Sequence, residues 1–342
     1  MKRSLSLLFY LRRELMKRSL KLFTGVLLAV SFGLLPWGAM AQRDDSYPNR
    51  PVRIIVPFGA GTTTDQVARF LAQHLSDETK QPFIIDNKPG ANGSIALRYA
   101  LTQPADGYTF VVGTGTTFAA NLSLYKTLGY DPVKDYAPIS NLIVGGVVLA
   151  VSASSPVQSV PALIEVMKKN PGKLTFGTAN SSSLAGGEVL RELTQVNIVN
   201  VPYKTLPAAI TDLIGGQIDM VFGDTPAMMP SVRSGKLRAL GVSTQQRIAV
   251  LSEVPTFIEQ GIKGYEVIGW VAAFAVSATP AAVITKLNKM MVNAMQTAEA
   301  EKMFGATGWL SVPGTPAQLG DFQRDEIEKW SRLVKSAGIV PE

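Results

Sequence analysis

The chain has 342 residues, of which 46% are hydrophobic and 17% are charged. This balance is typical of a packed globular protein with room for two domains, and it excludes an intrinsically disordered chain. The formal net charge is +7, but residues 1–41 hold seven basic residues and one acidic residue, so the nearly neutral remainder lacks the broad basic surface of a nucleic-acid-binding protein.

Residues 1–41 have the pattern of a secretory signal peptide. A basic segment precedes an apolar stretch at 22–35, and the sequence AMA at 39–41 supplies the small residues that signal peptidase needs. The apolar stretch is about fourteen residues long, shorter than the roughly 20 of a spanning helix, which disfavours an uncleaved membrane anchor. We therefore expect a periplasmic protein that begins at Gln42, with translation starting at the first residue or at Met16, where the opening MKRS is repeated.

The body of the chain predicts alternating strands and helices. Strands are expected at 52–58, 82–87 and 108–114, with helices at 64–75 and 94–101. A second series begins near Val144, with strands at 145–152, 173–178, 197–203, 218–224 and 237–243 and helices at 160–169 and 206–216. A long apolar run at 265–277 precedes two closing helices at 281–298 and 316–337. This alternation predicts an α/β fold with a largely parallel sheet and ligands beyond the carboxyl ends of its strands.

Loops of small and hydroxyl-bearing residues follow several of the expected strands. The first loop contains Gly59 and Gly61, which let the backbone approach a ligand, and a run of threonines that leads into a helix. The N–H groups at a helix start suit a carboxylate or phosphate. A nucleotide is disfavoured, because no Lys follows the glycines and Thr64 breaks the dinucleotide pattern. A plain tight turn with a helix cap explains the same residues equally well.

Residues for covalent or metal chemistry are scarce. The chain has no cysteine, and its one histidine, His74, lies in a helical pattern beside an apolar stripe. Because neither a nucleophile–histidine pair nor a His/Cys metal site is assembled, we expect no catalytic residue, no metal and no cofactor. Asp65 and Asp224 leave open a secreted hydrolase with paired carboxylates, although Asp65 at a helix start more readily fixes the loop.

A series of short motifs runs along nearly the whole body of the chain. They are YPNRPVRIIVPFGAGTTTDQVAR, NKPGANGSIA, PADGYTFVVGTGT, YDPVKDYAPIS, NPGKLTFGT, VPYK, DLIGGQIDMVF, GKLRALGVS, VPTFIEQG and TPAAVITKLN. In this order the motifs resemble those of the Bug-type periplasmic solute-binding proteins, the receptors of tripartite tricarboxylate transporters. The resemblance implies a two-lobed type II periplasmic binding fold with a ligand cleft between the lobes, the first lobe being 42–143 plus 267–342 and the second 144–266.

The resemblance also implies which residues bind the ligand. In the family, two loops of the first lobe hold a carboxylate of the ligand through backbone N–H groups and bridging waters. The second lobe contacts the rest of the ligand. The implied residues are Phe58, Gly59, Ala60, Gly61, Thr62, Thr63, Asp65, Thr116 and Thr117 in the first lobe, Asn180, Ser181, Ser182, Tyr203 and Asp224 in the second, and Trp270 after the crossover. The chain departs from the family where GAGTTTD replaces PGGGTD, where Ser183 and Gly187 replace His and Glu, and where YKT replaces YKG.

The resemblance thus implies a receptor that binds a small organic carboxylate and passes it to the membrane subunits of a tripartite transporter, acting as a monomer. The first-lobe loops contain no Arg or Lys, so mono- and dicarboxylates are expected to outrank citrate, with Phe58, Tyr203 or Trp270 as candidates to pack an aromatic ligand. Besides the hydrolase, a sensor that presents its ligand to a signalling partner is the alternative.

Overall fold

The computed structural model describes residues 47–336 and 338–341. The predicted signal peptide at 1–41 and its cleavage site lie outside the described residues. Within the described part, none of the helices combines the length and the apolar character that crossing a bilayer requires.

The first lobe is built around three parallel strands in the order β2-β1-β3. These are β1 (Val52–Val56), β2 (Phe83–Asn87) and β3 (Thr109–Thr114), connected by α2 (Thr63–Thr79), the short turn η1 (Ala91–Gly93) and α3 (Ser94–Leu101). The buried face of α2 holds Val67, Leu71 and Leu75 at helical spacing, which is why this segment packs as a helix against the strands. Because the three strands are parallel, their carboxyl ends and the loops that follow them lie at the same edge of the sheet.

The second lobe repeats this arrangement with the parallel order β7-β5-β6. Its strands are β5 (Thr175–Thr178), β6 (Val199–Pro202) and β7 (Met220–Asp224), and its helices are α5 (Val160–Lys169), α6 (Ser181–Thr194), α7 (Leu206–Ile214) and α8 (Thr225–Arg233). A further strand, β8 (Leu237–Val242), pairs antiparallel with β4 (Tyr136–Ser152), and the turn η3 (Ala249–Leu251) follows it.

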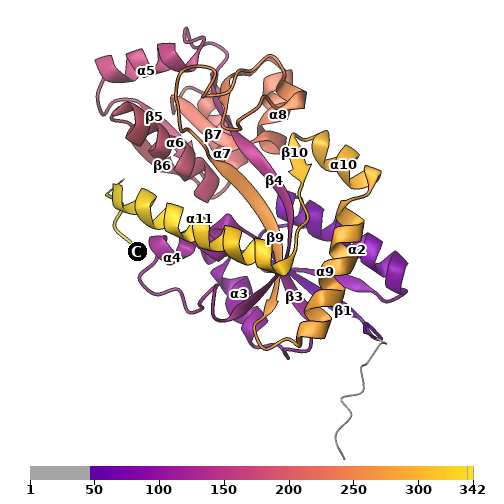
Figure 1. Cartoon of the computed structure of the whole chain (residues 1–342). Helices are drawn as coiled ribbons and strands as arrows, with labels where there is room; N and C mark the ends of the chain where they lie inside the picture. The colour runs from indigo at the N-terminus through magenta and orange to yellow at the C-terminus, as the bar shows by residue number, and fades with distance from the viewer. Residues whose placement is uncertain (1–46, 337, 342) are drawn as a thin grey trace, which may run out of the picture. The chain divides into compact units, whose positions relative to one another are not determined.

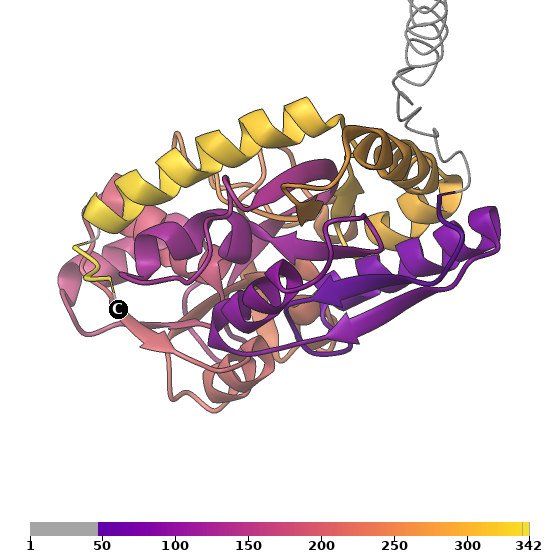
Figure 2. The same ribbon diagram turned by 90° about the horizontal axis from the view of Figure 1, so that it is seen from below.

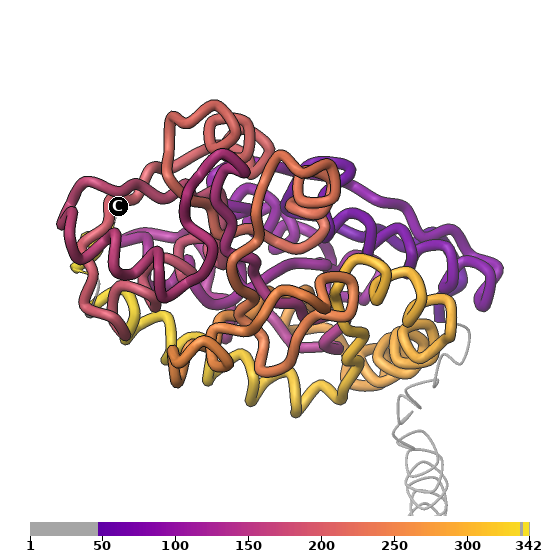
Figure 3. The backbone as a smooth tube through the Cα atoms, turned by 90° about the horizontal axis from the view of Figure 1, so that it is seen from above, coloured from indigo at the N-terminus to yellow at the C-terminus, as the bar shows by residue number. Residues whose placement is uncertain are grey.

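Two antiparallel strands join the lobes (Figures 1 and 3). β4 pairs with β9 (Ile268–Val276) along its first part and with β7 along its last part, so this one strand belongs to both halves of the sheet. The expectation of a largely parallel sheet is therefore wrong at the centre, because β4 and β9 run between the lobes in opposite directions. The expected lobe boundary at 143–144 falls inside β4, and the one at 266–267 falls just before β9.

The C-terminal helices return to the first lobe, and α11 also reaches the second (Figure 2). α9 (Ala281–Met295) packs on α2, and α11 (Pro316–Ser336) packs on η2 (Thr116–Ala120), α4 (Asn121–Leu124) and α6. The Gln323 amide donates to the backbone oxygens of Phe118 and Pro132, at 3.0 and 3.1 Å. The single helix expected at 281–298 ends earlier, and α10 (Ala298–Gly305) and β10 (Trp309–Ser311) follow it, with β10 paired to β4.

Candidate functional site

The first loop is exposed and leads into the start of α2. Ala60, Gly61 and Thr62 are exposed, and Phe58, Gly59 and Thr63 are partly exposed. Thr62 caps the helix, since its side-chain oxygen accepts from the N–H of Asp65. Gly61 has φ +82°, the left-handed conformation that glycine adopts without strain.

Asp65 fixes this loop from inside, as the sequence suggested. Its side chain is 2% exposed and accepts hydrogen bonds from Gly61 N at 2.9 Å, Arg69 Nε at 2.8 Å and Asn87 Nδ2 at 2.9 Å. Burial alone would raise the pKa of this carboxyl, but the bonds from Arg69, Gly61 and Asn87 outweigh it and lower the pKa. Asp65 therefore acts as an ionised anchor of the loop.

Asn87 is a loop residue that the sequence reasoning missed. It ends β2, and its amide donates to Phe58 O at 3.0 Å as well as to Asp65. Its position could have been predicted, because Asn87 is a polar residue at the end of a strand and parallel strands bring their carboxyl ends together.

The two predicted threonines of the second loop, Thr116 and Thr117, have different contacts. Thr117 is fully buried, and its hydroxyl donates to Thr114 O at 3.1 Å. Thr116 begins the π-helical turn η2, is 6% exposed, and places its hydroxyl 2.8 Å from the hydroxyl of Ser181. Thr116 and Ser181 belong to different lobes, so this hydrogen bond joins the carboxyl end of β3 to the start of α6.

The start of α6 carries a capping box. The Asn180 side chain accepts from Ser183 N at 2.9 Å, and the Ser183 hydroxyl accepts from Asn180 N at 3.1 Å. Ser183 is fully buried and serves the cap. The cap leaves Ser181 and Ser182 at the first turn, where Ser181 meets the first lobe.

Asp224 ends β7 beside this cap. Its Oδ2 accepts from Asn180 Nδ2 at 3.3 Å, and its side chain is partly exposed. Burial raises the pKa of Asp224 to about 6, against the lowering effect of the Asn180 hydrogen bond. The structure thus brings four of the predicted residues together. Thr116 bonds to Ser181, Ser181 follows Asn180 in the chain, and Asn180 bonds to Asp224.

Two of the predicted aromatic residues are engaged elsewhere. The Tyr203 hydroxyl donates to Asp212 at 2.8 Å, and Tyr203 is partly exposed on the second lobe. Trp270 is 2% exposed, and its indole N–H donates to Glu326 of α11 at 3.1 Å. A Cβ on Gly115 would lie 2.8 Å from the Trp270 indole nitrogen, so a larger residue there would clash with the buried ring.

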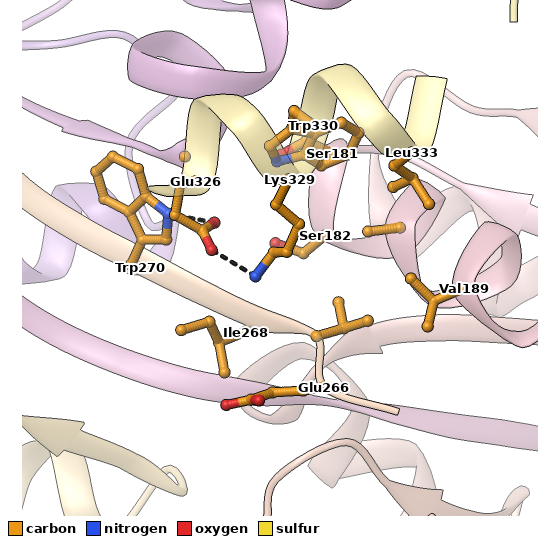
Figure 4. Close-up of a pocket in the computed structure, with 13 residues that line it drawn as sticks. Ser181, Ser182, Val189, Glu266, Ile268, Trp270, Glu326, Lys329, Trp330 and Leu333 are labelled. Carbon is orange, nitrogen blue, oxygen red and sulfur yellow. Dashed lines mark hydrogen bonds and ion pairs between the residues drawn. The ribbon is translucent and has the colours of Figure 1, made fainter. Parts of the chain in front are cut away.

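A cavity of about 20 Å³ lies between α11, α6 and the start of β9 (Figure 4). Ser181, Ser182 and Trp270 line it together with Glu326 and Lys329, which form an ion pair. The volume suits about one ordered water molecule rather than an organic acid. Three of the residues implied by the resemblance thus line a cavity that is too small for an organic acid.

The one histidine of the sequence packs against a neighbouring aromatic ring. His74 packs on Phe70, with its ring centroid 4.1 Å away and its Nδ1 3.0 Å from Phe70 O. Between residues 47 and 341, apart from Ala337, no group of three or more acidic or histidine residues could hold a metal ion. The two carboxylates of the hydrolase hypothesis have different surroundings, since Asp65 is engaged by three donors and Asp224 accepts one long hydrogen bond.

Comparison with known proteins places this geometry in a family. The model of the tripartite tricarboxylate transporter family receptor matches residues 67–339. The structure of Rpa4515 from R. palustris with adipate shares 35% sequence identity with a TM-score of 0.81 and covers 86% of this chain and 100% of that chain. The periplasmic binding protein BugD shares 30% identity with a TM-score of 0.77, over 86% of this chain and 100% of that one.

A third structure, MatC from Rhodopseudomonas palustris with bound malate, shares 29% identity with a TM-score of 0.75 and covers 84% of this chain and 100% of that chain. The resemblance read from the motifs and the two-lobed α/β fold are both confirmed by these matches. This chain therefore belongs to the receptors of the tripartite tricarboxylate transporter family, of the Bug type.

Proposed function

We propose that this protein binds one small organic carboxylate between its two lobes and delivers it to the membrane subunits of a tripartite transporter. The observation that carries the proposal is the hydrogen bond between Thr116 and Ser181, which joins loop ends of the two lobes. Ligands of α/β proteins bind at such loop ends. The adipate and malate bound by its relatives support a carboxylate.

The first loop supplies the anchor for the carboxylate in this proposal. The first N–H groups of a helix have no partner within it, so Thr63 and Thr64 at the start of α2 present N–H groups and a positive dipole end. Ala60 and Gly61 are exposed beside them, and Asp65 holds the loop in place. Neutral donors of this kind suffice for one carboxylate.

The remaining predicted residues complete the proposed site. Thr116, Asn180, Ser181, Ser182 and Asp224 contribute from the loop ends that meet across the lobes, and Thr117 supports its loop from the interior. Phe58 and Tyr203 are partly exposed and offer aromatic surface, whereas the Trp270 ring is buried against α11. The ligand shifts the equilibrium between open and closed lobes, and the transporter recognises the closed form.

Calorimetry with mono-, di- and tricarboxylates tests this function. Succinate, nicotinate and benzoate-type acids should outrank citrate, since the first loop carries no cation. Replacing Thr63 or Thr116 with Val removes a hydroxyl near the ligand and should weaken binding by about 1.5–3 kcal/mol. Thr79→Val is the matched control, because Thr79 is partly exposed at the opposite end of the same helix. Unchanged affinity in both test variants would show that neither hydroxyl binds the ligand, and failure of all these acids to bind would refute the proposed function.

We further propose that the protein is exported to the periplasm and cleaved after Ala41. The basic, apolar and AMA segments of the sequence support this, as does the periplasmic binding protein BugD among its relatives. N-terminal sequencing of the exported protein should return Gln42 first, and an intact leader would overturn the assignment.

A further inference from the structure

Asp224 is a carboxylate without a cationic partner. It is the last residue of β7 and precedes α8, and among the described residues its side chain accepts one hydrogen bond, the 3.3 Å contact from Asn180. Within the described ranges, no Lys, Arg or His forms an ion pair with it. Its charge is therefore not neutralised locally.

The position of Asp224 places this charge near the first lobe. Asn180, its hydrogen-bond partner, is followed directly by Ser181, and the Ser181 hydroxyl lies 2.8 Å from that of Thr116. Asp224 also ends its strand at the edge where the loop ends of β5 and β7 lie side by side. A ligand anchored on the first-lobe loops would thus have its far end toward Asp224.

We propose that Asp224 determines specificity at the binding site assigned above: it selects acids whose far end donates a hydrogen bond, such as a hydroxyl, and rejects a second ionised carboxylate. This inference rests on the proposed function. An ionised carboxylate only accepts hydrogen bonds, so a hydroxyl or amide at the far end satisfies it. Two carboxylates in contact repel each other, and one of them must take up a proton to remain.

The surroundings of Asp224 make such proton uptake accessible near neutral pH. The residues that the structure places against it are uncharged, namely Asn180, which caps α6 and donates to it, and Val147, which lies opposite it on β4. Burial raises its pKa to about 6, and no charged neighbour contributes to the shift. A dicarboxylate that binds only beside protonated Asp224 would bind more tightly as the pH falls toward this value.

Two matched pairs of acids test the inference on the full mature chain. 4-Hydroxybutanoate and succinate differ only at the far end, as do 6-hydroxyhexanoate and adipate. At pH 7.5 we expect the hydroxy acid of the better-bound pair to bind at least tenfold more tightly than its diacid. Asp224→Asn should reduce this preference at least tenfold by admitting the diacid. Lowering the pH from 8 to 6.5 should raise diacid affinity severalfold in the wild type and not in the variant.

Asp219→Asn is the matched control. Asp219 stands just before the other end of β7 and bonds to Thr175, so its replacement removes the same charge far from the cap of α6. The preference of the Asp219→Asn variant for the hydroxy acid over the diacid should equal that of the wild type. Diacid binding at pH 7.5 that is as tight as hydroxy-acid binding and is unaffected by Asp224→Asn would overturn the inference while leaving the proposed function intact. Failure of all four acids, nicotinate and benzoate to bind would refute the proposed function and this inference with it.

Discussion

Single side chains hold the first loop in its shape, and Asp65 is the clearest example. Its three donors come from the loop, from α2 and from the end of β2. Asp65→Asn replaces an ionised acceptor by a neutral group, and we expect the free energy of unfolding at pH 7 to fall by about 1–3 kcal/mol. Urea unfolding measures this loss. Asp77→Asn, an exposed position on the same helix, should change stability by less than about 0.5 kcal/mol.

The effect of Asp65→Asn should depend on pH in a defined direction. Because the folded protein lowers the pKa of Asp65, its contribution is complete above the unfolded value of 3.8 and is lost as the pH falls through the folded value. The difference in unfolding free energy between wild type and variant should therefore shrink between pH 7 and pH 3. A difference that stays constant over this range would show that the Asp65 charge contributes nothing.

At the scale of elements, a buried hydrogen bond joins α11 to the centre of the sheet. Glu326 is 5% exposed and accepts from the Trp270 indole. Glu326→Leu should lower the unfolding free energy by about 1–3 kcal/mol, because it leaves a buried N–H without an acceptor. Glu326→Gln keeps an acceptor and should cost less, as measured by denaturant unfolding. Equal losses in the two variants would assign the effect to the negative charge of Glu326, which pairs with Lys329, instead of to the hydrogen bond.

Local patterns predicted some elements closely and missed others for physical reasons. The helices at 94–101 and 160–169 match the sequence prediction, the second helped by Ser159 as its cap and Pro161 in its first turn. The first half of β4 was missed, since its pairing with β9 shifts register near Pro138 and Asn141 and interrupts the alternation. Of the site, the loops were predictable, whereas the meeting of Thr116 with Ser181 depends on the arrangement of distant elements.

At the scale of the whole molecule, the first lobe depends on the end of the chain. β9 lies between β3 and β4, and Gln323 of α11 bonds to Phe118. A fragment that ends at residue 266 would expose the edges of both strands. We expect it to show no cooperative unfolding transition by circular dichroism, while the mature chain unfolds cooperatively. Slow amide exchange in β1 and β3 of the fragment would contradict this expectation.

The insertion of β9 between β3 and β4 also sets an order in time. Synthesis proceeds from the N-terminus at about 5–20 residues per second, so the strands of the first lobe emerge long before the one that joins them. Until residues 268–276 appear, that lobe has no complete sheet to fold into. A nascent chain of this design stays unfolded for longer, and the proposed export through a narrow translocation channel requires an unfolded chain.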